Sequence, residues 1–486
     1  MIALLLTLFT QAAPTSAPAA PPRPNFIFVL GEGEGWSSTS IDMDGADPSH
    51  ARPAGLTPNL ERIAAVGLRF SDFYASCPRC TPSRASFLTG ISPAKLHMTY
   101  VNEGGANRRE EPTPRKLAPP SPVAQLPFEA PTTASVLRAS GYATAHFGKW
   151  HVGRADPTRH GFDVSDGANT NQGPERGVEP NPAQFAALTE RGLEFIRAQA
   201  KAGKPFFLQM SHYSASNESQ CTEESLAAAR KLLKDASGKT LGSAAGMHAL
   251  DTQLGRVLAL LDELDLDERT FVFYSADHGT PGGAGRRAGP NPPLSGGKGS
   301  VSEGGIRVPF LVRGPGVRRG AVSTVRASGM DLLPTLAELA GAPLPTSDKP
   351  DEPFAVEGGS LAGVLRGDDA QAVKRPRAEL VIHFPHYDLD NGGPASALFD
   401  GPWKLVRNYE RGSLALYDIR ADSGEHNDLA SSQPELVKEL DKKLTDYLRA
   451  VRAQLPTPIA ADGAPPAAPA QPKKPGKRKE SEREEG

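Results

Sequence analysis

Three short runs of mostly apolar residues, each followed by polar or charged residues, constrain the fold of this chain more than any other feature. The runs are Phe26–Leu30, Phe206–Met210 and Phe271–Tyr274. A run that is apolar on both faces predicts a strand buried on both sides, which is typical of a parallel sheet covered by helices. Because the carboxyl ends of parallel strands meet at one edge of a sheet, we expect a functional site among the polar residues that follow these runs.

The segments between the strands carry a helical pattern. From Met247 to Leu264, apolar side chains recur at the spacing of one helix face. These positions are Leu250, Leu254, Val257, Leu258 and Leu261. Strand and helix in alternation predict an α/β fold with a mostly parallel central sheet flanked by helices.

The chain changes character near residue 375. Three short segments separated by turn residues are typical of a small antiparallel sheet, and a helical pattern follows from about Pro434 to Leu455. The three segments are Ala397–Phe399, Trp403–Val406 and Leu414–Tyr417. We therefore expect a smaller C-terminal subdomain of antiparallel sheet plus helix. Residues 456–486 are rich in Pro and Ala and then in charge, so they cannot bury a core and are predicted to be disordered.

The N-terminus predicts export. An apolar run, Ile2–Phe9, precedes the small residues Ala12 and Ala13, after which a signal peptidase could cleave. The run is too short for a membrane-spanning helix, which needs roughly 20 apolar residues. We expect a secreted or periplasmic protein without stable membrane insertion. Its expected divisions are a signal peptide (1–13), a Pro/Ala-rich linker (14–24), a catalytic domain (25–374), the C-terminal subdomain (375–455) and the tail (456–486).

Charge and cysteine content narrow the possible functions. The 54 basic and 56 acidic residues give a net charge of -2, which provides no electrostatic excess for binding nucleic acid. The three cysteines are too few for a disulfide scaffold. If Cys77 pairs with Cys221, Cys80 is left as an unpaired thiol that needs another role in an oxidising compartment.

The most specific local pattern is Cys80–Arg84, Cys-Thr-Pro-Ser-Arg, which continues to Gly90. An isolated cysteine before a helix is usually a packing residue, with the proline in the first turn. The whole string resembles the signature of the sulfatases, within the alkaline-phosphatase-like superfamily, and the resemblance extends from Pro24 to about Leu455. It implies that a formylglycine-generating maturation enzyme oxidises Cys80 to formylglycine. When hydrated, that aldehyde offers one hydroxyl to attack sulfur and a second to expel sulfate.

Two further segments match the family in order. Gly148–Gly153 is similar to its Gly-Lys-Trp-His-x-Gly motif, which implies that Lys149 binds the modified side chain and sulfate. By the same resemblance His151 takes a proton when sulfate leaves. A lysine and a histidine two positions apart on an extended segment can face one anion together. The segment around Lys298 resembles another family block whose lysine contacts sulfate, and Arg84 adds a further positive charge to balance the anion.

The resemblance also implies a divalent cation, with calcium as the expected ion. Asp277 and His278 follow the third apolar run and are similar to the family's strand-end metal pair, in which Asp precedes Asn or His. Glu32 stands at the first ligand position after the first run. Together with the modified side chain of Cys80, these residues form the expected metal site.

The sequence departs from the family pattern at two places. After the first strand, the family usually has two adjacent aspartates, whereas this chain has Glu32 and Gly33. A hard cation needs several oxygen ligands at about 2.3–2.6 Å, so the loss of one carboxylate weakens its binding. The alternative is that Glu32 and Glu34 are solvated turn residues of a lost site. Ser216 stands where a family histidine faces sulfate. His212, four residues earlier, is a candidate substrate-binding residue and, with the lysine of the later block, a candidate for protonating the leaving group.

Three functions remain open from the sequence. The first is a sulfatase acting on a sulfated small molecule or polysaccharide, with a sulfated carbohydrate expected from the resemblance. The second is a phosphodiesterase or phosphonate hydrolase with the same nucleophile, and the third is a non-catalytic relative that binds anions or glycans. The complete Cys80 motif argues against the third, because a binding module has no use for that chemistry. Specificity is expected to lie in the loops Val101–Leu126 and Arg286–Leu294.

Overall fold

A computed structural model describes the chain over residues 23–101, 115–174, 181–282, 291–345, 352–368, 373–388 and 393–459, with the backbone alone described for residues 181–183. The predicted signal peptide, most of the predicted linker, residues 102–114 and 283–290 of the two predicted specificity loops, and tail residues 460–486 lie outside this description.

An eight-stranded sheet forms the centre of the molecule, in the order β10-β2-β9-β8-β1-β7-β5-β6. Its strands are β1 (Asn25–Gly31), β2 (Leu68–Phe70), β5 (Ala143–Gly148), β6 (Val164–Ser165), β7 (Phe206–Ser211), β8 (Thr270–Ala276), β9 (Phe310–Arg313) and β10 (Ala321–Ser323). The three apolar runs became the neighbouring strands β8, β1 and β7, which pair in parallel. Strand β9 alone pairs antiparallel, with β8 and β2. The prediction of a mostly parallel sheet is therefore confirmed.

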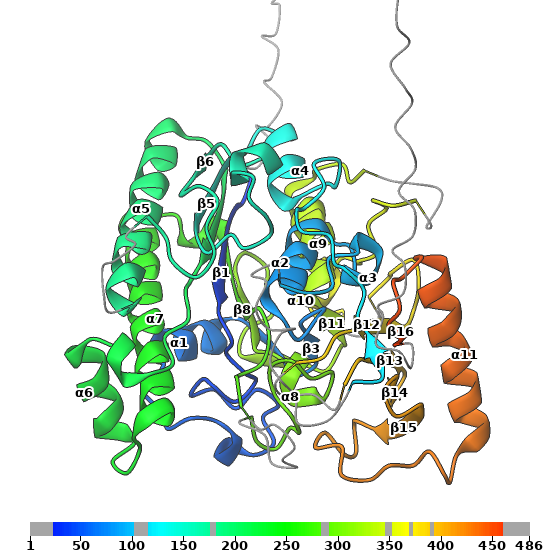
Figure 1. Cartoon of the computed structure of the whole chain (residues 1–486). Helices are drawn as coiled ribbons and strands as arrows, with labels where there is room; N and C mark the ends of the chain where they lie inside the picture. The colour runs from blue at the N-terminus through cyan, green and yellow to red at the C-terminus, as the bar shows by residue number, and fades with distance from the viewer. Residues whose placement is uncertain are drawn as a thin grey trace, which may run out of the picture.

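Helices cover both faces of this sheet (Figure 1). The longer helices are α1 (Pro58–Val66), α2 (Cys80–Thr89), α4 (Thr133–Ala139), α5 (Asn181–Ala202), α6 (Glu223–Leu232), α7 (Gly238–Glu263) and α9 (Leu332–Ala340), and the short ones are α3 (Pro93–Leu96), α8 (Glu303–Ile306) and α10 (Ala362–Leu365). Helices α5 and α7 pack on one face, and α2, α4 and α9 on the other. The apolar positions predicted for the segment from Met247 to Leu264 are all buried in α7.

The sheet register brings the strand ends together. Leu30 in β1 pairs with Ser211 in β7, and Gly31 pairs with Ala276 in β8. The residues immediately after these strands therefore emerge at one edge, as the sequence predicted for a parallel sheet.

The C-terminal part forms a four-stranded antiparallel sheet with a helix against it, as predicted. The strands are β12 (Leu380–Phe384), β13 (Ala395–Asp400), β14 (Trp403–Asn408) and β15 (Ser413–Asp418), and the helix is α11 (Pro434–Ala450). Helix α11 buries Leu440, Leu444 and Leu448 against Leu398 and Leu405 of the sheet. The sequence had not indicated β12.

Short strand pairs tie distant segments together. Strand β3 (Phe73–Tyr74) pairs with β11 (Ala327–Ser328), and β4 (Leu117–Ala118) pairs with β16 (Thr457–Pro458). The last pair corrects the expected start of the tail, because backbone hydrogen bonds hold the chain past Leu455 as far as Ile459.

The three cysteines are buried and free, so the pairing considered for Cys77 and Cys221 does not form. Within the described ranges, none of the helices combines the length and the apolar character needed to cross a bilayer.

Candidate active site

Cys80 is the first residue of helix α2, and local sequence explains this placement. Arg79 before it is extended, and Pro82 lies in the first turn, where backbone N–H groups have no partner inside the helix. Gly90 ends the helix in the left-handed region, with φ 68°. All side chains of α2 are buried, and the partial positive charge of the helix N-terminus favours an anion at Cys80.

The three other residues expected as metal ligands converge on Cys80. Glu32 follows β1, and Asp277 and His278 follow β8. The Sγ of Cys80 lies 3.1 Å from Glu32 Oε1 and 3.1 Å from His278 Nε2. One ligand atom from each of the four residues lies within 4.8 Å of the others, and all four residues are buried. Such a group of acceptors suits a divalent cation.

Three cations surround this cluster. Arg84, one turn after Cys80, donates to Asp277 Oδ2 at 3.0 Å and to Glu32 Oε2 at 2.8 Å. Lys149 Nζ lies 3.1 Å from Glu32 Oε2. Lys298 Nζ lies 3.5 Å from Glu32 Oε1 and 3.7 Å from Cys80 Sγ. The structure thus brings together Glu32, Cys80, Arg84, Lys149, Asp277, His278 and Lys298 from the sequence-based set.

The cations set the charge state of the cluster. Burial alone raises the pKa of Glu32, but Lys149 and Lys298 outweigh it and hold that pKa well below its ordinary value. Burial and Glu32 raise the pKa of the Cys80 thiol, and the same two lysines bring it well below its ordinary value. Burial, with the charge of Glu32, raises the pKa of Asp277 to about 6. The alternative of solvated turn residues is wrong for Glu32, which is only 6% exposed.

Glu34 is partly buried. Its Oε2 accepts a 2.6 Å hydrogen bond from the hydroxyl of Tyr274, and burial of the carboxyl raises its pKa to about 8. The carboxyl lies over Gly31 at the end of β1, where a Cβ on that glycine would be 2.1 Å from Glu34 Oε2. Glu34 therefore packs against the end of β1 and is not a fully solvated turn residue.

The two histidines expected near sulfate differ in setting. His151 is buried, and its φ of 57° shows that the segment after Lys149 is left-handed there and not extended as expected. His212 packs its ring edge-on against Phe185 at 5.2 Å, and burial lowers its pKa to about 3. Among the described residues neither ring nitrogen of His212 has a hydrogen-bond partner. This is the setting of a neutral packing residue. It does not suit the two roles predicted for His212, which were to bind the substrate and to protonate the leaving group.

The sequence reasoning missed one partner of the cluster. Asn171 Oδ1 accepts a 2.6 Å hydrogen bond from Lys149 Nζ. The nearby Asn169 accepts one from the backbone N–H of Trp150 at 3.1 Å. Both asparagines lie in a polar loop after β6, which in sequence has only the composition of a turn. The contact depends on tertiary structure, so no local pattern could have identified it.

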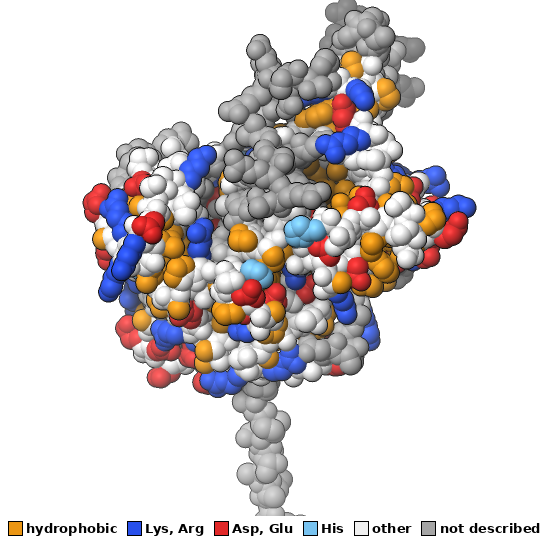
Figure 2. Space-filling model, turned by 90° about the horizontal axis from the view of Figure 1, so that it is seen from below, with side chains coloured by type: hydrophobic (Ala, Val, Ile, Leu, Met, Phe, Trp, Pro, Cys, Tyr) orange, Lys and Arg blue, Asp and Glu red, His pale blue; other side chains and the backbone are white. Residues whose placement is uncertain are grey.

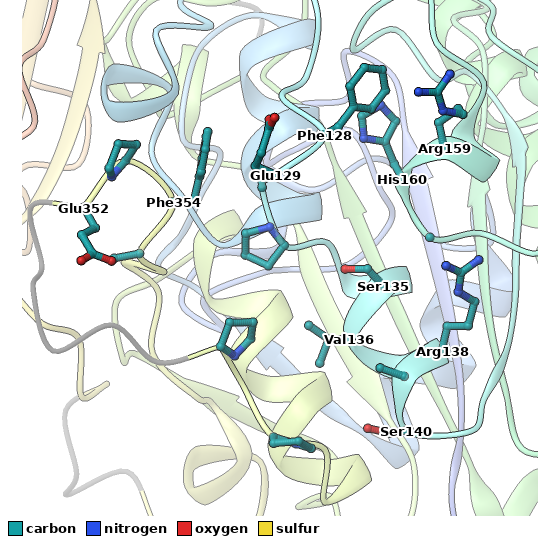
Figure 3. A pocket seen from close by; sticks show the side chains of 18 of the residues that line it. Phe128, Glu129, Ser135, Val136, Arg138, Ser140, Arg159, His160, Glu352 and Phe354 are labelled. Atoms are coloured by element: carbon teal, nitrogen blue, oxygen red, sulfur yellow. The ribbon is translucent and has the colours of Figure 1, made fainter.

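Figure 2, seen from the side toward which β1 runs, shows acidic, basic and hydrophobic side chains intermixed over the visible described residues. A pocket of about 880 Å³ around Phe128, Arg138 and Arg159 is also lined by Arg23, which precedes β1 (Figure 3). That pocket lies toward the amino end of β1 and contains no residue of the cluster. The pocket is therefore separate from the candidate active site.

Comparisons with known proteins agree with this geometry. A model of the family described as Sulfatase matches residues 24–342. The chain is 31% identical over 408 residues to N-acetylgalactosamine-6-sulfatase of Canis lupus familiaris, covering 76% of this chain and 73% of that protein. It is 31% identical over 461 residues to arylsulfatase A of Homo sapiens, covering 86% and 82%.

A solved structure of Ps i-CgsB in complex with k-i-k-neocarrahexaose shares the fold, with a TM-score of 0.70 at 22% identity and coverage of 88% of this chain and 93% of that one. The match of the family model over most of the chain, together with relatives of this identity and coverage, shows that the chain belongs to the sulfatase family of sulfuric ester hydrolases.

Proposed function

We propose that this protein hydrolyses sulfate esters of a carbohydrate through a formylglycine made from Cys80, with a divalent cation held by Glu32, Asp277 and His278. The observation that carries this proposal is the convergence of Cys80 with carboxylates, an imidazole and three cations in one buried cluster. When present, the hydrated aldehyde supplies a nucleophilic hydroxyl and a second hydroxyl, and the cation polarises an oxygen at the site.

The basic residues of the cluster bind sulfate or hold the carboxylates in place. Lys149 and Lys298, which lie beside the two carboxylate oxygens of Glu32, bind the sulfate oxygens and offset their charge. Arg84 holds Glu32 and Asp277 in place by donating to both carboxylates. Its third contact, to the backbone oxygen of Lys149 at 2.8 Å, connects α2 to the end of β5.

Two proton transfers have candidate residues. His151 accepts the proton that is lost when sulfate leaves the enzyme, as the resemblance implies. Lys298 is the candidate donor to the departing alcohol, because it lies beside Cys80 and keeps 17% of its side chain exposed. Burial lowers the pKa of Lys298, but Cys80 and Glu32 outweigh burial and raise it, so Lys298 remains cationic at neutral pH.

A sulfated saccharide is the proposed substrate class. The relatives include a sulfatase named for N-acetylgalactosamine 6-sulfate, and a structure of similar fold was solved with neocarrahexaose. We further infer that the protein is exported and is matured by a formylglycine-generating enzyme, as the N-terminal run and the Cys80 motif imply.

Parallel assays on the sulfate and the phosphate ester of one aryl alcohol test the reaction class. Protein from a host that matures sulfatases should release sulfate faster than phosphate, and Cys80→Ala should release neither. Cys221→Ala, another buried cysteine remote in sequence, serves as the matched control and should keep full activity. Faster phosphate release, or activity that survives in Cys80→Ala, would overturn the proposal.

A further inference from the structure

The ligand atoms at the centre of the cluster are not those that calcium prefers. Calcium takes about six to eight oxygen ligands. Here the described side chains offer oxygens from Glu32 and Asp277, a nitrogen from His278 and a sulfur from Cys80. Gly33, at the place of the second carboxylate, offers no side-chain ligand. The residues fit a divalent cation but fit calcium poorly.

The imidazole of His278 occupies the space above Gly33. A Cβ built on Gly33 would lie 3.3 Å from His278 Cε1 and 3.5 Å from Pro281 Cδ. The backbone N–H of Gly33 donates to Asp277 Oδ1 at 3.0 Å, in a turn with φ 65°. A side chain at position 33 would therefore lie in close contact with this imidazole, and Gly33 leaves that space open.

The imidazole of His278 faces the cluster with its Nε2. Its Nδ1 lies 2.9 Å from the carbonyl oxygen of Gly279, which can only accept, so Nδ1 carries a hydrogen. Nε2 lies 3.3 Å from Asp277 Oδ1 and 3.8 Å from Glu32 Oε1, and it is the ring atom placed to bind a cation. A backbone carbonyl that fixes the tautomer in this way is typical of histidines that bind metals.

Cations outside the cluster hold the carboxylates in place. Arg84 binds the outer oxygens, Glu32 Oε2 and Asp277 Oδ2, while Oε1 and Oδ1 face Nε2. Of the two inner oxygens, Glu32 Oε1 also lies 3.5 Å from Lys298 Nζ, and Asp277 Oδ1 accepts from the backbone N–H of Gly33. Four donors of nitrogen, oxygen and sulfur type at this spacing suit zinc and related transition ions, which prefer low coordination numbers and softer ligands.

We propose that this site selects a divalent transition ion of the zinc class over calcium, because Gly33 offers no oxygen ligand and His278 Nε2 offers a nitrogen. This proposal concerns which ion binds, and it rests on the proposed function for what the ion does. In protein that still carries the cysteine, the Cys80 sulfur is the fourth ligand atom of the set. In the converted protein the sulfur is gone, and His278 alone keeps the preference.

Cobalt(II) serves as the probe, bound to full-length protein from a host without sulfatase maturation, so that Cys80 keeps its sulfur. One cobalt should bind per chain, with the near-ultraviolet absorption of a sulfur–cobalt bond. Zinc should abolish this absorption at equimolar amounts, while calcium in large excess should leave it. Displacement of cobalt by calcium, or the absence of bound cobalt, would overturn the proposal.

Substitutions assign the ligands. Cys80→Ser should lose the near-ultraviolet band but still bind cobalt, and His278→Asn should weaken zinc binding by more than about tenfold. His426→Asn, at a histidine whose side chain is 55% exposed, is the matched control and should bind zinc normally. The double variant Gly33→Asp/His278→Asn should shift the preference toward calcium, as calorimetry would show. Unchanged zinc affinity in folded His278→Asn would contradict the assignment even if the double variant failed to fold.

The same preparation separates this inference from the proposed function. Zinc binding through His278 without sulfate release by converted protein would leave the ion assignment intact and remove the sulfatase proposal. If converted protein released sulfate when loaded with calcium alone and had no affinity for zinc, the sulfatase proposal would stand and the ion assignment would be wrong.

Discussion

At the scale of single residues, the cluster balances its charges within itself. Glu32, Asp277 and the Cys80 sulfur oppose Arg84, Lys149 and Lys298 at distances of 2.8 to 3.7 Å. In a buried site each charge depends on its partners, because an uncompensated one is costly. Removing one charge of the cluster should therefore lower stability as well as catalysis.

Lys149→Ala and Lys298→Ala should each lower kcat/KM for a sulfate ester by about one to two orders of magnitude. Each removes a charge-assisted hydrogen bond to the anion, worth ~1.5–3 kcal/mol. Lys443→Ala, whose side chain is 40% exposed and lies in the C-terminal helix, should leave kcat/KM unchanged. Equal kcat/KM in the three variants, measured by steady-state kinetics, would show that Lys149 and Lys298 do not bind the sulfate group.

His151→Ala should accumulate sulfated enzyme. If His151 accepts the proton that accompanies sulfate release, its loss slows the second half of the reaction while the first half continues. Intact-mass spectrometry after incubation with substrate measures the covalent species. Normal turnover with no sulfated protein would show that another group does this work.

At the scale of elements, the start of helix α1 depends on one carboxylate of helix α7. Asp251 Oδ2 accepts from the backbone N–H of Asn59 at 3.0 Å, and Oδ1 accepts from that of Leu60 at 2.8 Å. These are N–H groups that a helix leaves without internal partners. Burial nevertheless prevails and raises the pKa of Asp251 from 3.8 to about 6.

This shift makes stability depend on pH with a definite sign. A carboxyl whose folded pKa is raised stabilises the fold fully below about pH 4, and that contribution is lost as pH rises through about 6. For Asp251 the loss is roughly 3 kcal/mol. In Asp251→Asn, the fall in the free energy of unfolding between pH 4 and 6 should be smaller than in wild type by this amount. Urea unfolding measures it, and an unchanged slope in Asp251→Asn would contradict the pKa. Asp262→Asn, 53% exposed on the same helix, should keep the wild-type slope.

At the scale of the whole molecule, a buried ion network joins the C-terminal sheet to the catalytic part. Lys404 in β14 lies 2.8 Å from Glu303 Oε1 and 2.8 Å from Glu425 Oε1, and its side chain is fully buried. Glu303 also accepts a 2.8 Å hydrogen bond from the hydroxyl of Tyr74 in β3. Since Glu303 begins α8, shortly after Lys298, the network supports the loop that carries that lysine.

Lys404→Met should lower the free energy of unfolding by about 3–5 kcal/mol, because it removes the cation that two buried carboxylates, Glu303 and Glu425, share. Lys443→Met is the matched control. It removes a partly exposed lysine paired with Asp400 and Glu439, and should cost about 0–1 kcal/mol. Denaturant unfolding compares the two, and equal losses would show that the network contributes little.

Much of this architecture could be predicted because its causes are local. Apolar runs specify β1, β7 and β8 whatever surrounds them, and the string from Cys80 to Arg84 contains its own helix start. The contact between Gly33 and His278 could not be predicted, because those residues are far apart in sequence and meet only when β1 and β8 pair.

Two other features that the sequence did not predict also depend on contacts between residues far apart in the chain. The contact from Asn171 to Lys149 forms only after a loop folds back over the sheet edge, and the sequence of that loop indicates no more than a turn. His212 has a residue type suited to catalysis, but Phe185 of another element determines its setting. Residue type therefore indicated which side chains could act, while packing determined which of them reach the cluster.

The mass of a proteolytic peptide that contains Cys80, from protein made in a host that matures sulfatases, decides whether the nucleophile exists. Formylglycine at position 80 replaces the CH₂–SH group by an aldehyde, so the peptide should show the corresponding lower mass and should react with an aldehyde-specific hydrazide. The same peptide from a host without maturation should keep the thiol mass. A thiol that stays unmodified in the competent host would contradict a formylglycine-dependent sulfatase built on Cys80.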